Sequence, residues 1–169
     1  FSRDGQRVVY VTWDDKQFGS VRVLDLSTGQ SNVLATGKGK FVEPVFSPDG
    51  QHVVYRKISG GYITDPQWAK EPGIYRVPVA GGKPEFITDN GYMAQFGNKS
   101  DRIYVMRSGG SPEFHEINLD SKKEFLRYSG KHVTEFHISP NGQYLAFAER
   151  FKVFVTPFVT TGKGISIGH

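Results

Sequence analysis

The chain has 169 residues, enough for a domain with an extensive core, and its 20 glycines and 14% aromatic residues are typical of short strands joined by tight turns. Cysteine is absent, which excludes disulfides, thiolate metal ligands and a cysteine nucleophile. The formal net charge of +4 is spread along the chain rather than gathered in a basic stripe, so nucleic acid is not an expected partner.

A ten-residue segment recurs along the chain and organises the predicted strands. It reads FSRDGQRVVY at 1–10, FSPDGQHVVY at 46–55 and ISPNGQYLAF at 138–147, with a degenerate copy, FGNKSDRIYV, at 96–105. The copies return about every 40–50 residues, which is the length of one four-stranded propeller blade. The repeat therefore predicts consecutive blades, whose strands we name A to D in chain order from the centre outward.

Each copy predicts the end of strand A, a tight turn and a hairpin into strand B. Strand C, a second turn and a short strand D then follow before the next strand A begins. The predicted strands B include 8–13 and 144–148, the strands C are 21–26, 74–79, 114–119 and 153–158, and the strands D are 33–34, 86–87, 125–126 and 165–167.

The first turn at 47–50 and 139–142, Ser-Pro-Asp/Asn-Gly, has the residues that a tight turn requires, whereas Gly97-Asn98-Lys99 replaces Ser-Pro-Asp in the third copy. Proline presets φ, Asp or Asn accepts hydrogen bonds from the turn backbone, and glycine adopts a positive φ. We therefore expect Ser47 and Ser139 to bond to the turn backbone rather than to act as nucleophiles.

Strands B and C contain nearly continuous apolar runs, such as 8–11, which predicts burial on both faces. We predict an all-β fold, a β-propeller with about four four-stranded antiparallel blades that form part of a larger ring. A small closed ring of four blades and a β-sandwich are the alternatives. The chain, 1–169, is then a single propeller fragment with approximate blades 1–37, 38–89, 90–130 and 131–169.

These repeats resemble those of the TolB-like propellers over essentially the whole chain. Residues 46–55, 73–82 and 86–88 form a nearly complete unit of that type. Residues 139–158 and 161–163 resemble, more narrowly, the propeller region ahead of the catalytic domain in large bacterial amidohydrolases. The resemblance implies a non-catalytic accessory or scaffold module whose active site lies outside this chain. A protein-interaction module as in TolB, or the gating propeller of a prolyl-oligopeptidase-like peptidase, is the alternative.

The resemblance also implies partners and a location. The expected partner is a catalytic domain of the same polypeptide or another protein, with self-association through exposed blade faces as a further route. A periplasmic or extracellular location follows from the resemblance alone. The sequence begins with Phe1 and shows neither a signal peptide nor the run of about 20 apolar residues that crosses a bilayer. We read it as a fragment or a processed product.

Few residues suggest chemistry. The five histidines lack the His-x-His and His-Glu-x-x-His spacings of metal sites, so we expect no metal, no cofactor and no catalytic residue in this chain. Glu43 and Glu135 occupy equivalent positions at the start of strand A, where side chains can border a propeller channel. There they could bind a cation or a positively charged group.

The loops between strands B and C, and between strand D and the next strand A, share one face of a propeller. Here they are longer and combine aromatic with charged residues, which suits recognition. The alternative for the two tryptophans is simple packing over the blade ends. The candidate binding residues are Trp13, Asp14, Glu43, Arg56, Tyr62, Trp68, Tyr92, Arg107, His132, Glu135, Glu149 and Arg150.

Overall fold

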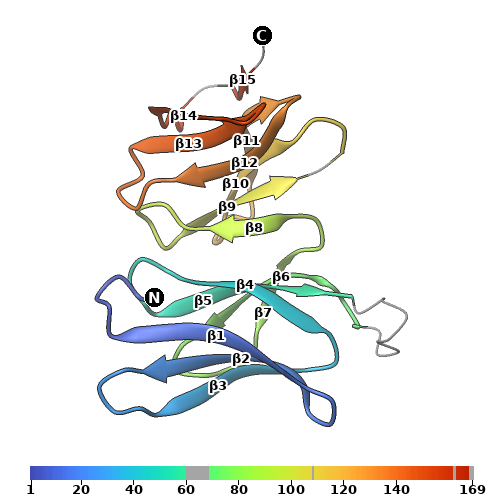
Figure 1. The fold of residues 1–169 in the computed structure, drawn as a ribbon, viewed down its shortest axis with the longest axis vertical. Coiled ribbons are helices and arrows are strands. Elements are labelled where there is room, and N and C mark those ends of the chain that lie inside the picture. The colour runs from blue at the N-terminus through green and yellow to red at the C-terminus, as the bar shows by residue number, and fades with distance from the viewer. Residues whose placement is uncertain (60–68, 108, 162, 168–169) are drawn as a thin grey trace. The chain divides into compact units, whose positions relative to one another are not determined.

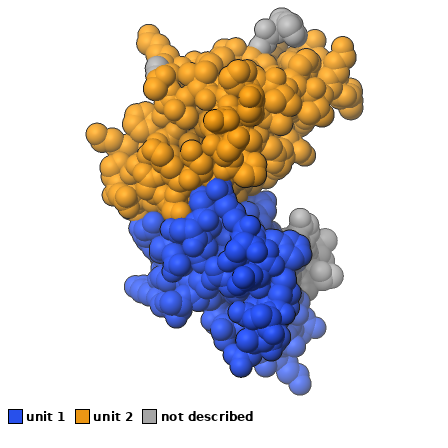
Figure 2. Space-filling view, turned by 90° about the vertical axis from the view of Figure 1, so that its left-hand side faces the viewer, with its two compact units in different colours: residues 1–90 blue, residues 91–169 orange. Residues whose placement is uncertain are grey.

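A computed structural model describes residues 1–59, 69–107, 109–161 and 163–167. Within these ranges the regular structure consists of fifteen β-strands in four sheets (Figure 1). The described part of the chain contains no helix with the length and apolar character of a membrane span. The all-β prediction is confirmed, and Figure 2 colours the two compact units, 1–90 and 91–169, into which the chain divides.

Unit 1 contains two antiparallel sheets whose strands follow one another in chain order. The first sheet has the predicted strands B, C and D, and the second sheet has all four strands of a blade. The first consists of β1 (Arg7–Asp14), β2 (Phe18–Asp25) and β3 (Ser31–Gly37), and the second of β4 (Lys40–Phe46), β5 (His52–Ile58), β6 (Gly73–Pro78) and β7 (Glu85–Thr88).

Unit 2 repeats this arrangement with one difference. The third sheet contains four consecutive antiparallel strands and a fifth strand from the end of the chain, and the fourth sheet has three strands. The third consists of β8 (Tyr92–Gln95), β9 (Arg102–Arg107), β10 (Glu113–Asn118), β11 (Glu124–Gly130) and β15 (Ile165–Ile167), and the fourth of β12 (Val133–Ile138), β13 (Tyr144–Glu149) and β14 (Lys152–Pro157).

The assignment of 165–167 as strand D of the fourth blade was wrong. This segment, β15, pairs in parallel with β11, with Tyr128 opposite Ile165. The Tyr128 hydroxyl donates to the carbonyl of Pro157 at 3.2 Å and accepts from the N–H of Val159 at 3.1 Å, which directs the chain after β14 back across β11. Because β11 offers an unpaired edge, the short apolar segment adds there.

The turn that follows strand A has the predicted serine geometry. Ser47 is fully buried; its N–H donates to the carbonyl of His52, and its Oγ accepts from the N–H of His52, both at 2.9 Å. Asp49 accepts from the N–H of Gln51 at 3.0 Å, and Gly50 has φ 66°. Ser2 and its neighbours repeat these bonds, as do those of Ser139. The serines are therefore turn residues, as predicted.

One backbone bond recurs in all four sheets. It joins the N–H at the end of strand C to the carbonyl of the residue that follows the first turn. In the third sheet, whose turn lacks the Ser-Pro-Asp-Gly sequence, Leu119 still donates to Asp101 at 2.7 Å. The same bond forms from Leu26 to Gln6, Val79 to Gln51 and Phe158 to Gln143. The degenerate copy is therefore a true repeat.

Each unit has its own core between its two sheets. In unit 1 the core includes Val21, Val53 and Val77, all fully buried. In unit 2 aromatic rings dominate, with Phe114 stacked on Phe136 at 5.2 Å between ring centroids. Such faces fit the predicted stacking of blades, while the assignment of 1–169 to a single propeller stays a prediction.

The turn after strand C uses an Asx side chain in two sheets. Asp25 Oδ1 accepts from the N–H groups of Ser27 and Thr28, both at 2.9 Å. At the equivalent position, Asn118 Oδ1 accepts from Asp120 and Ser121. Hydrogen bonds, that from the Ser27 side chain first, lower the pKa of Asp25 to about 2. The same turn thus forms around a charged and a neutral acceptor.

We predict that Ser47→Ala destabilises the chain by about 1–3 kcal/mol, because it removes the side-chain acceptor of a buried N–H. The measurement is the midpoint of urea denaturation. Ser111→Ala, at an exposed serine, is the matched control with an effect below about 0.5 kcal/mol. Equal destabilisation by both variants would contradict the role of the buried turn serine.

We predict that Asp25→Asn makes stability less dependent on pH between about 4 and 2. The folded-state pKa of Asp25 is depressed, so its contribution is complete above the unfolded pKa of about 3.9 and is lost as pH falls through about 2. Asn keeps the acceptor oxygen, as Asn118 shows. Melting temperatures from pH 5 to 2 test this, with Asp120→Asn as the control; an unchanged acid slope in Asp25→Asn refutes it.

Candidate functional site

Glu43 and Arg56, predicted separately as site residues, form an ion pair. Glu43 lies in β4, where a bulge gives it φ 55°, and Arg56 lies on the adjacent strand β5. Arg56 Nη2 donates to Glu43 Oε1 at 2.7 Å, and both side chains are about 30% exposed or less. The cation that Glu43 was expected to bind is therefore supplied by the protein itself, although Nε of Arg56 is buried with no partner.

Trp13 and Asp14 are the last two residues of β1 and directly precede the β1–β2 loop. Asp14 Oδ1 accepts from the N–H groups of Lys16 and Gln17, both at 2.8 Å, which lowers the pKa of Asp14 and makes it a turn residue. Trp13 is 42% exposed, and its ring lies 6.3 Å from that of Phe18.

Trp13 also lines a surface hollow of about 260 Å³. The first residues of β4, Lys40 to Val42, form the other side of this hollow. The end of β1 and the start of β4, which adjoin the β1–β2 loop and the β3–β4 connection, thus meet at one place.

Arg107 is held in an ion-pair cluster on the third sheet. Its Nε and Nη2 donate to the carboxylate of Glu124 at 2.6 and 2.7 Å. His115 lies between two acids, with Nε2 2.7 Å from Glu113 Oε2. Its Nδ1 lies 2.7 Å from Glu124 Oε1 but without hydrogen-bond geometry. The guanidinium of Arg107 therefore binds a carboxylate of its own sheet.

The remaining predictions have separate outcomes. Tyr92 is half-buried in β8 and packs against the unit 2 core. Glu149 is buried at the end of β13 opposite Val133, and Glu135 is exposed, 3.3 Å from His137. The two other aromatic candidates, Tyr62 and Trp68, lie outside the described residues.

His132 and Arg150 are brought together by the structure. With five neighbours they line a hollow of about 510 Å³, formed by the β11–β12 connection and the β13–β14 hairpin; we call it the hairpin hollow. Its lining consists of Lys131, His132, Val133, Thr134, Ala148, Arg150 and Phe151. In unit 2 the two predicted kinds of loop, between strands D and A and between strands B and C, therefore meet at one hollow.

Sequence reasoning missed Phe151, which is fully exposed. Glu149 pairs with Lys152, so Arg150 and Phe151 alone connect β13 to β14. Both have positive φ, 45° and 68°, which is the two-residue turn that normally takes Asn-Gly. Such backbone costs of order 1–3 kcal/mol at each non-glycine residue and is concentrated at functional sites. The sequence carried no signal for this exposure, which only the structure of the hairpin reveals.

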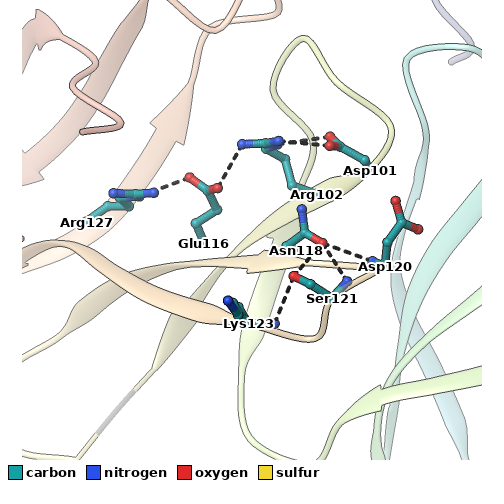
Figure 3. Close-up of polar contacts among 8 residues, drawn as sticks. All are labelled: Asp101, Arg102, Glu116, Asn118, Asp120, Ser121, Lys123 and Arg127. Carbon is teal, nitrogen blue, oxygen red and sulfur yellow. Dashed lines mark hydrogen bonds and ion pairs between the residues drawn. The ribbon is translucent and has the colours of Figure 1, made fainter. Parts of the chain in front are cut away.

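Sequence reasoning also missed a buried carboxylate on the third sheet. Glu116 is 2% exposed and bonds to Arg102 and Arg127, each at 3.0 Å (Figure 3). Arg102 also forms two bonds to Asp101, and the hydrogen bond from Arg102 is the main cause that lowers the pKa of Asp101. Tyr104 lies opposite Glu116 in the ladder, and burial raises its pKa. This network ties three strands together.

Metal chemistry finds no support in the described ranges. No group of three His, Asp or Glu side chains among these residues is arranged to hold a metal ion. His115 adjoins Glu113 and Glu124, and His137 adjoins Glu135.

Comparison with known proteins identifies structures with a similar fold. No protein-family model matches the chain. An uncharacterized protein of Agrobacterium fabrum is 25% identical, over 90% of this chain and 54% of that protein. TolB from Acinetobacter baumannii matches with TM-score 0.75 and 22% identity, over 95% of this chain and 40% of TolB. The tricorn protease matches with TM-score 0.67 and 10% identity, over 93% of this chain and 20% of the protease.

These likenesses define the class of protein. The chain has the fold of a TolB-like β-propeller region, built from antiparallel sheets of three to five strands. It spans about half the length of its Agrobacterium relative and a smaller part of TolB.

We predict that Glu116→Gln destabilises the chain by about 3–5 kcal/mol, because two arginines lose their buried carboxylate. Chemical denaturation measures this. Glu85→Gln is the matched control, since its pair with Arg76 is more exposed and is worth about 0–1 kcal/mol. A loss below about 1 kcal/mol in Glu116→Gln would show that the network does not stabilise the sheet.

Proposed function

We propose that this chain is the non-catalytic, partner-binding part of a longer TolB-like propeller protein. The observation that carries the proposal is a surface hollow in each unit, at the strand ends next to the predicted recognition loops in unit 1 and between two such loops in unit 2. In unit 1 the hollow combines Trp13 with Lys40, and in unit 2 it combines Phe151 with Lys131 and Arg150. An aromatic side chain beside a cation, on loops held by a rigid sheet, is typical of recognition surfaces.

The polar residues elsewhere support a recognition role rather than catalysis. The serines bond to turns, and Arg56, Arg76, Arg102, Arg107 and Arg127 bond to carboxylates. No pair of acids adjoins either hollow among its lining residues. The chemistry that a nucleophile or an acid–base pair requires is thus not assembled at these loops.

The identity of the partner divides the proposal into two forms. In the first, which the resemblance of 139–158 to amidohydrolase-associated propellers favours, the partner is a catalytic domain of the same polypeptide. In the second, as in TolB-like interaction modules, the partner is a separate protein. The likeness to the tricorn protease and to prolyl endopeptidases fits a propeller beside a peptidase domain. A periplasmic or extracellular location belongs to the same proposal.

Site-specific photo-crosslinking in the full-length gene product tests the proposal. A benzophenone amino acid replaces Trp13 or Phe151 in the host cell, and the matched control carries it at Phe125, an exposed aromatic residue of β11. We expect defined adducts from the two loop positions and none from Phe125. An intramolecular adduct identifies a domain of the same chain, and an intermolecular adduct identifies a separate protein.

Two results would overturn the proposal. One is the same adduct pattern at Phe125 as at the loops, or no adduct at either loop. The other is hydrolysis of peptide, ester or amide substrates by purified 1–169 that survives Arg150→Gln and Trp13→Ala, because turnover would then belong to a site that we have not described.

A further inference from the structure

The hairpin hollow combines a cationic rim with an apolar lining. Lys131 and His132 belong to the β11–β12 connection, and Arg150 belongs to the facing β13–β14 hairpin. The apolar part comes from Val133, Ala148 and Phe151. The volume of about 510 Å³ lies within the range of ligand sites, about 300–1,000 Å³. The composition suits a ligand with a negative charge next to an apolar group.

Arg150 differs from every other arginine of the chain. Each of the others has a hydrogen bond, an ion pair or a ring contact, whereas Arg150, like Lys131, forms no hydrogen bond or ion pair with any described residue. The partnered arginines are Arg3, Arg7, Arg22, Arg56, Arg76, Arg102, Arg107 and Arg127. The guanidinium at the hollow is therefore available for a ligand.

The acids of the fourth sheet do not neutralise this rim. Glu149 is buried and does not line the hollow. Glu135 lies opposite Ala148 but does not line the hollow, and its carboxylate is 3.3 Å from His137. A ligand at the hollow therefore meets positive charge without a competing carboxylate from the lining.

We infer that the hairpin hollow binds the carboxyl-terminal residue of a polypeptide. Arg150 and Lys131 receive the terminal carboxylate, and Phe151 and Ala148 contact an apolar last side chain. Arginine suits this task because its planar fork donates two parallel hydrogen bonds to one carboxylate. The inference rests on the proposed function and deepens it, since it names the chemistry of the partner.

A chain end fits better than an internal acidic segment. The hollow has cations on two sides of a small apolar lining. A carboxyl-terminal leucine or phenylalanine matches it, because one residue carries both the negative charge and the apolar group. An internal Asp or Glu carries its carboxylate on a polar side chain, and the apolar contact must come from another residue. The strained hairpin holds Arg150 and Phe151 at the hollow before a ligand arrives.

Binding of labelled hexapeptides to the full chain, followed by fluorescence anisotropy, tests the inference. One peptide ends in two leucines as the free acid, the second is the same peptide as the carboxyl-terminal amide, and the third is an amidated peptide with an internal aspartate between leucines. We expect the free acid to bind at least about tenfold more tightly than either amidated peptide, a difference of about 1.4 kcal/mol. Raising the salt concentration should reduce this preference.

Three variants locate the site. Arg150→Gln should weaken binding of the free acid about tenfold or more and remove the difference between acid and amide. Lys123→Gln, on an exposed turn of the same unit, is the matched control and should change neither. Arg150→Asn combined with Phe151→Gly places the preferred residues in the hairpin turn, so it should keep or raise the melting temperature while binding is lost.

The outcomes separate this inference from the proposed function. Equal binding of acid and amide, equal binding of the internal aspartate peptide, or insensitivity to Arg150→Gln overturns the chain-end inference. If crosslinks form at Phe151 while no peptide binds, the recognition surface stands and its ligand is not a chain end. If neither peptides bind nor crosslinks form, both are overturned.

Discussion

The bond between the end of strand C and the residue after the first turn is the constraint on which each sheet depends. It forms from Leu26 to Gln6 and from Leu119 to Asp101, at 2.9 and 2.7 Å. Because it fixes where strand C stops relative to strand B, it sets the register of both strands, and the register sets where the opposite loops emerge. The hollows at those loops are a consequence of this backbone bond and not of the loop sequences alone.

The backbone geometry tolerates different side chains wherever this bond is kept. The third sheet lacks the Ser-Pro-Asp-Gly turn, and its second turn is built on Asn118 where the first sheet has Asp25. Repeats can therefore diverge in charge and polarity while their strands keep the same order. This freedom allows the third sheet to bury Glu116 between two arginines in place of an apolar residue.

The sequence was most informative where chemistry is local. The serine turns and the order of strands were predicted because proline, aspartate and glycine dictate backbone angles within a few residues. The pairing partner of β15 was not predictable, because the apolar segment Ile165–Ile167 could pair with any free strand edge. The edge of β11 is selected by Tyr128, which lies on a strand distant in sequence and bonds to the chain after β14. Long-range partners are not encoded in the segment itself.

The same limit explains the candidate site. Arg56 and Arg107 looked like recognition residues because their carboxylate partners, Glu43 and Glu124, lie on other strands. Glu116 was not among the candidates, because an acid in a strand is usually solvated. Arg150 and His132 were placed correctly because they sit at loop ends whose position follows from strand order. Phe151 required the positive φ values of the hairpin, which only the structure supplies.

The hydroxyl of Tyr128 links the third sheet to the segment that leaves the fourth. It bonds to both Pro157 and Val159, and β15 then completes the third sheet. Separating the two segments must break these bonds, so we expect the amide protons of β11 and of the chain beyond β14 to exchange as one cooperative unit. Two neighbouring repeats are thereby joined into a single folding block, although repeats of this kind otherwise contact one another only through their faces.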